Sequence, residues 1–179
     1  MIVVDLFAGC GGLSEGFRSA GYKVAASLEI DQTCCETLKL NEKQDAGVIF
    51  CCDIRKTDDY LPELKKVSAA HGGTDLIIGG PPCQAYSVAG RIRDPDGMRD
   101  DYRNYLFESF VENLNALRPK AFLFENVTGM LSAKPGGILI EDRISAEFAK
   151  SGYEVIKGFK NAVVSMTELG LPQKRSRVI

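Results

Sequence analysis

The stretch that decides the fold is Asp5-Leu-Phe-Ala-Gly-Cys-Gly-Gly-Leu-Ser-Glu-Gly16, which joins an apolar run at Ile2–Phe7 to an expected helix at Leu13–Ala20. Its closely spaced glycines allow a tight turn whose backbone can approach a ligand. The first N–H groups of the following helix lack partners within the helix and can bind an anion. The stretch therefore predicts a strand, a ligand-binding turn and a helix in succession.

Strand-like and helix-like segments alternate through the rest of the chain. We expect strands at Lys23–Glu29, Val48–Cys52, Asp75–Ile78 and Ala121–Phe124, a strand-rich segment at Tyr153–Val164, and helices at Asp31–Leu40, Asn104–Leu117 and Ile138–Lys150. Strands that alternate with helices predict right-handed crossovers and a mainly parallel, doubly wound sheet. The expected fold class is α/β, with a Rossmann-like sheet that binds its ligand at the carboxyl ends of the strands.

Length and charge exclude several classes of protein. The chain has 179 residues, 22 Lys and Arg against 24 Asp and Glu, a net charge of −2 and 45% hydrophobic residues. These values predict one compact domain and do not support a disordered chain or a polybasic nucleic-acid binder. The first residues carry no signal-peptide pattern, and no apolar run is long enough to span a membrane. We therefore expect a cytoplasmic protein without a membrane partner.

The cysteine pattern does not predict a metal site or a disulfide framework. Six cysteines occur without any Cys-x-x-Cys spacing, and His71 is the one histidine. Zinc sites need such spacings, so no metal is expected. Five of the thiols are expected to be small buried groups in a reducing compartment. They are Cys10, Cys34, Cys35, Cys51 and Cys52, and Cys83 is the exception.

Two carboxylates stand where a nucleotide could contact them. Glu29 ends the second strand, 20 residues beyond Gly9, and can accept hydrogen bonds from ribose hydroxyls. Asp53 is expected at the end of the third strand, where its carboxylate could accept a hydrogen bond from an adenine amino group. The ends of three successive strands would then line one crevice. This pattern alone leaves open whether the cofactor is a nicotinamide nucleotide or S-adenosylmethionine.

A second group of motifs carries a nucleophile. Pro81-Pro-Cys-Gln84 follows the fourth strand, and Glu125-Asn-Val127 follows the fifth, 42 residues after Cys83. Neighbouring strand ends of a parallel sheet can bring a thiolate and a carboxyl group into one pocket. The stretch Gly79–Arg103 is too long for a routine connection and is expected to be a functional loop. The third motif of this group is the basic sequence Gln173-Lys-Arg-Ser-Arg177 near the end of the chain.

Taken together, these motifs resemble the DNA (cytosine-5) methyltransferases, of the bacterial type, in the order of that family and over Asp5–Ile179. The resemblance implies a class I methyltransferase fold with S-adenosylmethionine as methyl donor and S-adenosylhomocysteine as product. The cofactor contacts that it implies are Phe7, Gly9, Cys10, Gly12, Leu13, Glu29, Ile30, Asp53, Ile54, Pro82 and Leu106. The catalytic residues that it implies are Cys83, Gln84, Ser87, Glu125, Arg175 and Arg177.

The same resemblance implies double-stranded DNA as partner and a role for each catalytic group. Cys83 would add to carbon 6 of a cytosine flipped out of the duplex, which makes carbon 5 nucleophilic. Glu125 would contact ring N3 and the exocyclic amine, with Arg177 at the base or beside Glu125. Arg175 would face backbone phosphates. Gln84 and Ser87 would lie on the loop that closes over the base.

The resemblance also shapes the expected domain organisation. We expect residues 1–179 to form the catalytic domain, without the family's target-recognition domain and final helix, which a missing C-terminal part or a second chain would carry. Two alternatives stay open. One is a non-catalytic or partner-dependent cofactor-binding subunit or fragment, and the other is an RNA cytosine-5 methyltransferase. The target DNA sequence cannot be inferred from these residues.

Overall fold

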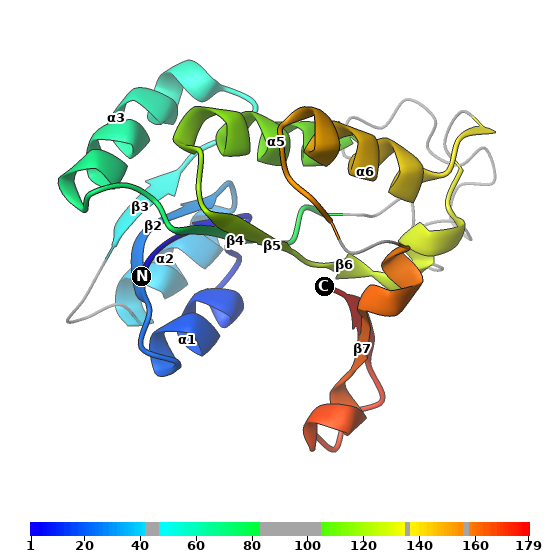
Figure 1. Ribbon diagram of the computed structural model, residues 1–179. Coiled ribbons are helices and arrows are strands. Elements are labelled where there is room, and N and C mark those ends of the chain that lie inside the picture. Colours follow the sequence, from blue (N-terminus) through cyan, green and yellow to red (C-terminus); the bar gives the residue numbers. More distant parts are fainter. Residues whose placement is uncertain (42–46, 83–104, 135–136, 156–157) are drawn as a thin grey trace. The chain divides into compact units, whose positions relative to one another are not determined.

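The computed structural model describes residues 1–41, 47–82, 105–134, 137–155 and 158–179 (Figure 1). The chain divides into two units. The first consists of Met1–Gly80 with Glu112–Leu123, and the second of Pro81–Val111 with Phe124–Ile179. None of the helices in the described ranges has the length and apolar character needed to cross a membrane.

The first unit is built on a parallel sheet. Its strands are β1 (Ile2–Leu6), β2 (Lys23–Glu29), β3 (Val48–Cys51), β4 (Leu76–Gly79) and β5 (Ala121–Phe124), in the order β3-β2-β1-β4-β5. β1 pairs in parallel with β2 and β4, and β2 pairs in parallel with β3. The strands start and end within two residues of the positions expected from sequence. The expected α/β class with a mainly parallel sheet is confirmed.

Helices cover both faces of this sheet. α1 (Gly12–Ser19) and α2 (Gln32–Asn41) lie on one face, and α3 (Thr57–Ala70) lies on the other (Figure 1). The sequence patterns did not predict α3, because Pro62 stands within it and few apolar residues mark its buried side. That side is the stripe Tyr60, Leu64 and Ser68, at the spacing of one residue per helical turn.

The central strands are apolar because they are buried on both sides. Side chains less than 2% exposed include Val3, Val4, Leu6, Val24, Ala26, Leu28, Ile77 and Ile78. One acidic group is buried among them. Asp5 on β1 is fully buried, and its carboxylate accepts a 2.6 Å hydrogen bond from the hydroxyl of Ser14 on α1. This bond ties the start of α1 to the strand that precedes the glycine turn.

The Tyr60 hydroxyl links three segments inside the first unit. It donates to the Ile54 carbonyl at 3.1 Å and accepts from Nδ2 of Asn113 at 2.8 Å. Burial raises the pKa of Tyr60 to about 12, so the hydroxyl stays protonated. Tyr60→Phe should leave two buried polar groups without this partner and lower the free energy of unfolding by about 1–3 kcal/mol. Urea unfolding at neutral pH would measure the loss.

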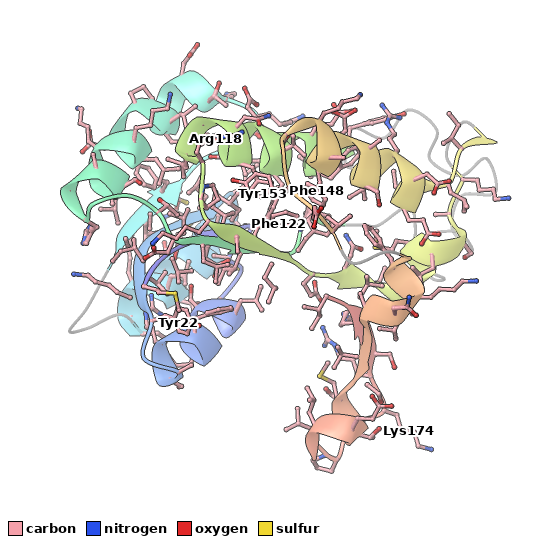
Figure 2. All side chains as sticks on the ribbon, viewed as in Figure 1. Tyr22, Arg118, Phe122, Phe148, Tyr153 and Lys174 are labelled. Atoms are coloured by element: carbon pink, nitrogen blue, oxygen red, sulfur yellow. The ribbon has the colours of Figure 1, made fainter. Side chains whose placement is uncertain are left out.

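Tyr22→Phe makes the same chemical change elsewhere in the first unit and serves as the control. The Tyr22 ring packs edge-on against Phe17, with centroids 5.2 Å apart, and Figure 2 labels it. This control should change the free energy of unfolding by less than about 0.5 kcal/mol. Equal losses in the two variants would show that the Tyr60 hydroxyl contributes no net stability.

The second unit contains a small antiparallel sheet. β6 (Asn126–Val127), β8 (Ser176–Val178) and β7 (Val163–Ser165) pair in the order β6-β8-β7. The helices described in this unit are the first half of α5 (Leu106–Leu117), α6 (Ile140–Lys150) and the 3₁₀ turns η2 (Thr128–Ser132), η4 (Phe159–Ala162) and η5 (Met166–Leu169). Its aromatic core joins Phe110, Phe124 and Phe148, with centroids 5.3 to 6.1 Å apart.

The expectation of a strand-rich segment at Tyr153–Val164 is wrong for most of its length. Within the described part of that segment, only Val163 and Val164 lie in a strand, and Phe159–Ala162 forms a 3₁₀ turn. Gly158 precedes this turn with a φ of +70°, which redirects the chain. The apolar residues Phe159 and Ala162 of this turn are buried.

Candidate active site

The glycine turn after β1 has a backbone that requires glycine. Gly9 and Gly11 adopt φ of +55° and +89°, and a Cβ added to Gly11 would lie 2.7 Å from Cδ2 of Leu38. Phe7 also has a positive φ, of 59°, which is a strained conformation for a bulky residue. Such strain persists where the surrounding structure enforces it, often at ligand sites. Gly12 then begins α1, with its first N–H groups at the turn.

The Glu29 carboxylate holds this turn in place. Its Oε2 accepts the Gly9 N–H at 2.8 Å, and its Oε1 accepts the N–H groups of Ile30 and Asp31 at 2.8 and 2.9 Å. Asp31 in turn caps α2, because its Oδ1 accepts the Cys34 N–H at 2.9 Å. The sequence identified Glu29 for its position at the end of β2. It did not reveal that Glu29 also anchors the turn, since no local pattern encodes a contact 20 residues away.

Asp53 lies beyond the third strand and not at its end. β3 stops at Cys51, and the Asp53 carbonyl accepts the Lys56 N–H at 2.9 Å in a turn. The turn stays beside β2, because the Cys52 N–H donates to the Glu29 carbonyl at 2.9 Å. The guanidinium of Arg55 bonds both carboxylate oxygens at 2.5 to 3.0 Å, and this pairing holds the pKa of Asp53 below its ordinary value. Asp53 is therefore an ionised acceptor, and Arg55 is a neighbour that the sequence patterns did not single out.

The remaining residues expected to contact a cofactor divide between the two units. The first unit brings the turn residues together with Glu29, Ile30, Asp53 and Ile54. Ile30 is 62% exposed beside Glu29, whereas Ile54 is buried. Pro82 and Leu106 belong to the second unit, where Pro82 is exposed and Leu106 is buried at the first position of α5.

The second unit joins two motifs that are far apart in sequence. Nε of Arg177 lies 2.8 Å from Oε1 of Glu125, with both side chains about one quarter exposed. Antiparallel pairing of β6 with β8 places Val127 opposite Arg177 and so aligns the two segments. Asn126, which stands between Glu125 and Val127 in the sequence, is buried, and its Nδ2 donates to the Pro81 carbonyl at 3.3 Å. The segment after β5 therefore contacts both the basic motif and the start of the Pro-Pro turn.

Arg175 does not join this ion pair. It is exposed, and its carbonyl accepts the Met166 N–H at 2.8 Å at the loop end of the β7–β8 hairpin. The neighbouring Lys174 side chain projects from the same end (Figure 2). An exposed arginine beside a lysine remains available to phosphates. Three expected catalytic residues, Cys83, Gln84 and Ser87, lie outside the described residues.

The cysteines differ from the expectation of five buried thiols. Only Cys35 is buried, whereas Cys10 and Cys51 are exposed and Cys34 and Cys52 are half-buried. The expectation was wrong because these residues stand at strand and helix ends, where the sheet is open. Within the described ranges, no three His, Cys, Asp or Glu side chains are grouped as a metal ion would need.

Comparison with known proteins confirms the resemblance stated above. The profile of the family described as C-5 cytosine-specific DNA methylase matches residues 1–179. The Type II methyltransferase M.Bpa9945I of Bacillus paralicheniformis is 35% identical, over all of this chain and 53% of its own length. M.AquIA of Picosynechococcus is 36% identical, over 98% of this chain and 69% of its own length.

Solved structures agree on the fold. An Escherichia coli protein described as a DNA modification methyltransferase encoded within a prophage superposes with a TM-score of 0.76 at 31% identity, over 99% of this chain and 44% of that one. DNMT2 of Spodoptera frugiperda has a TM-score of 0.64 at 18% identity, over 98% of this chain and 47% of that one. This chain spans 53%, 44% and 39% of the lengths of three Type II methyltransferases that it matches. With a sheet of methyltransferase topology and the family's motifs in order, the chain belongs to the C-5 cytosine-specific DNA methylase family.

Proposed function

We propose that this chain is the catalytic part of an enzyme that transfers a methyl group from S-adenosylmethionine to carbon 5 of cytosine in double-stranded DNA. The observation that carries the proposal is the 2.8 Å pair between Glu125 and Arg177, which assembles two of the family's motifs around one carboxylate. The same proposal places the enzyme in the bacterial cytoplasm, where its DNA substrate lies.

The first unit fits a nucleoside cofactor. The turn around Gly9 and Gly11 leaves backbone within reach of a ligand. After accepting three N–H groups, the Glu29 carboxylate has one acceptor site left, on Oε2, for a ribose hydroxyl. Asp53, which the pairing with Arg55 keeps ionised, can accept a hydrogen bond from the adenine amino group. When bound, S-adenosylmethionine supplies a methyl group on a positively charged sulfur.

The groups assigned to the base make carbon 5 of cytosine nucleophilic. The Cys83 thiolate forms a bond to carbon 6, which breaks the aromaticity of the ring and places electron density on carbon 5. A proton shared between Glu125 and ring N3 lets the ring accept the electrons, Glu125 accepts a hydrogen bond from the exocyclic amine, and Arg177 fixes the orientation of the carboxyl group. After methylation, loss of the proton on carbon 5 expels the Cys83 sulfur and restores the ring. Access of the base to these groups requires that it leave the duplex.

The cofactor half of the proposal predicts weaker binding in Glu29→Ala. This change removes the ribose acceptor and the anchor of the Gly9 N–H, so the dissociation constant for S-adenosylhomocysteine should rise at least about tenfold. Isothermal titration calorimetry measures it. Glu36→Ala makes the same substitution at an exposed position of α2, where the Glu36 carboxylate accepts a hydrogen bond from Nε2 of Gln32 at 3.2 Å, and should leave the affinity unchanged. Unchanged affinity in Glu29→Ala would refute the ribose assignment.

Methyl transfer itself is tested with labelled S-adenosylmethionine and duplex DNA of mixed sequence. The product should be 5-methylcytosine, identified by mass spectrometry after digestion to nucleosides. A parallel reaction contains tRNA. Label in tRNA alone would replace the DNA assignment by the RNA one, and cofactor binding without transfer to either would favour the partner-dependent subunit.

A further inference from the structure

Two thiols meet beside the glycine turn. Sγ of Cys10, within the turn, lies 3.6 Å from Sγ of Cys34 in the first turn of α2. Cys10 is exposed and Cys34 is half-buried, so a small molecule in solution can reach the pair. Both residues belong to the first unit, and 24 positions separate them in sequence.

The other described thiols are placed differently. Cys35 is fully buried, and burial is the main cause that raises its pKa to about 12. Sγ of Cys51 lies 3.2 Å from Oε1 of Gln32, and burial also raises the pKa of Cys52, to about 11. The Cys35 thiol also has a hydrogen bond with the Cys51 thiol, but Cys35 is fully buried. Among the described cysteines, Cys10 and Cys34 are therefore the sulfur-contact pair in which neither thiol is fully buried.

We propose that Cys10 and Cys34 form an oxidation site, at which a small-molecule disulfide converts the two thiols into an intramolecular disulfide. The Cys10 thiolate attacks the reagent RSSR, forms a mixed disulfide and releases RS⁻. The Cys34 thiolate then attacks the Cys10 sulfur, forms the internal bond and releases the second RS⁻. The two protein thiols lose two electrons and two protons, and RSSR is reduced to two RSH.

The order of these steps follows from exposure, because a reagent in solution reaches the exposed Cys10 before the half-buried Cys34. The hydrogen bond to Cys10, the main cause that raises the pKa of Cys34 to about 12, also keeps Cys34 protonated until Cys10 has reacted. Once Cys10 carries the reagent, that hydrogen bond is lost and Cys34 can ionise more readily. Reversible bonds of this kind are the form in which disulfides occur in reducing compartments.

The internal disulfide should act on cofactor binding, a consequence that rests on the proposed function. Closing the bond must bring the sulfurs from 3.6 Å to about 2 Å, which pulls the turn toward α2. The neighbouring Gly9 N–H donates to Glu29, and Asp31 caps the Cys34 N–H, so the bond strains the segments that hold the ribose carboxylate. The oxidised chain should bind S-adenosylhomocysteine at least about tenfold more weakly.

The oxidation is tested on the full chain, reduced, desalted and incubated with oxidised glutathione. Its mass should fall by two hydrogen atoms, and trypsin should yield residues 1–18, with Cys10, joined to residues 24–39, with Cys34 and Cys35. Cys34→Ser should abolish this cross-link, whereas the control Cys52→Ser should retain it. A stable glutathione adduct without a cross-link, a link from 24–39 to 44–55, or a cross-link that survives Cys34→Ser would each overturn the proposal.

Calorimetry on the reduced and oxidised chains tests the effect on the cofactor. Binding of S-adenosylhomocysteine and oxidation of Cys10 and Cys34 are coupled equilibria, and such coupling is reciprocal. If oxidation weakens binding tenfold, saturating S-adenosylhomocysteine must raise the midpoint potential of the Cys10–Cys34 pair by about 30 mV. Equal affinities of the two forms would refute the coupling. If the reduced chain binds S-adenosylhomocysteine but forms no cross-link, this inference fails and the proposed function stands; if it does not bind, the proposed function fails while the peptide map still reports on the thiols.

Discussion

Cys83→Ala is expected to abolish methyl transfer, with a loss of at least about a thousandfold in rate, because no other group is assigned to add to carbon 6. Without that addition, carbon 5 stays part of an aromatic ring and does not attack a methyl group. The affinity for S-adenosylhomocysteine should stay within about twofold, since the ribose and adenine acceptors belong to the first unit. Transfer of label to duplex DNA and calorimetry measure the two quantities.

Cys52→Ala serves as the matched control, because it removes a thiol from the chain without removing the expected nucleophile. It should retain transfer at the rate of the unmodified chain. A covalent complex with DNA that contains 5-fluorocytosine gives an independent readout, since fluorine at carbon 5 cannot leave as a proton and the adduct persists. The complex should form with the unmodified chain and not with Cys83→Ala. Wild-type turnover in Cys83→Ala would exclude Cys83 as the nucleophile.

Glu125→Gln is expected to have the second largest effect, a loss of about 10²–10³ in kcat with little change in cofactor affinity. The amide has the shape of the carboxylate but lacks the charge that pairs with Arg177 at 2.8 Å, so its bond to the amino edge of cytosine is weaker. Single-turnover methyl transfer with saturating cofactor separates this loss from binding. Glu168→Gln, at an exposed position of η5 in the same unit, is the control.

The ion pair between Arg177 and Glu125 makes a further outcome testable. If Arg177 only orients the carboxylate, Arg177→Ala should cost much less in the Glu125→Gln background than alone. Arg177→Lys should have a higher kcat than Arg177→Ala, since lysine keeps the positive charge but lacks the planar guanidinium that can form two parallel hydrogen bonds. Fully additive losses would mean that Arg177 contacts the substrate independently of Glu125.

Much of the fold could be predicted from local sequence. The five strands of the parallel sheet and four helices were placed within two residues, since apolar runs and the glycines that break them are local signals. α3 was missed because its buried stripe holds one tyrosine, one leucine and one serine. Asp53 was expected at the end of the third strand, whereas that strand stops at Cys51 and a turn begins at Asp53, since a short strand and its flanking turn share the same apolar pattern.

The sequence by itself determined the order of the motifs, the positive-φ turn at Gly9 and the carboxylate at the end of β2, because each depends on residues that are neighbours along the chain. Only the tertiary structure decided that Arg177 pairs with Glu125, that Arg175 does not, and that Cys10 meets Cys34. These contacts join residues 24 to 52 positions apart. They depend on strand register and helix placement, where a shift of one residue turns a side chain to the opposite face.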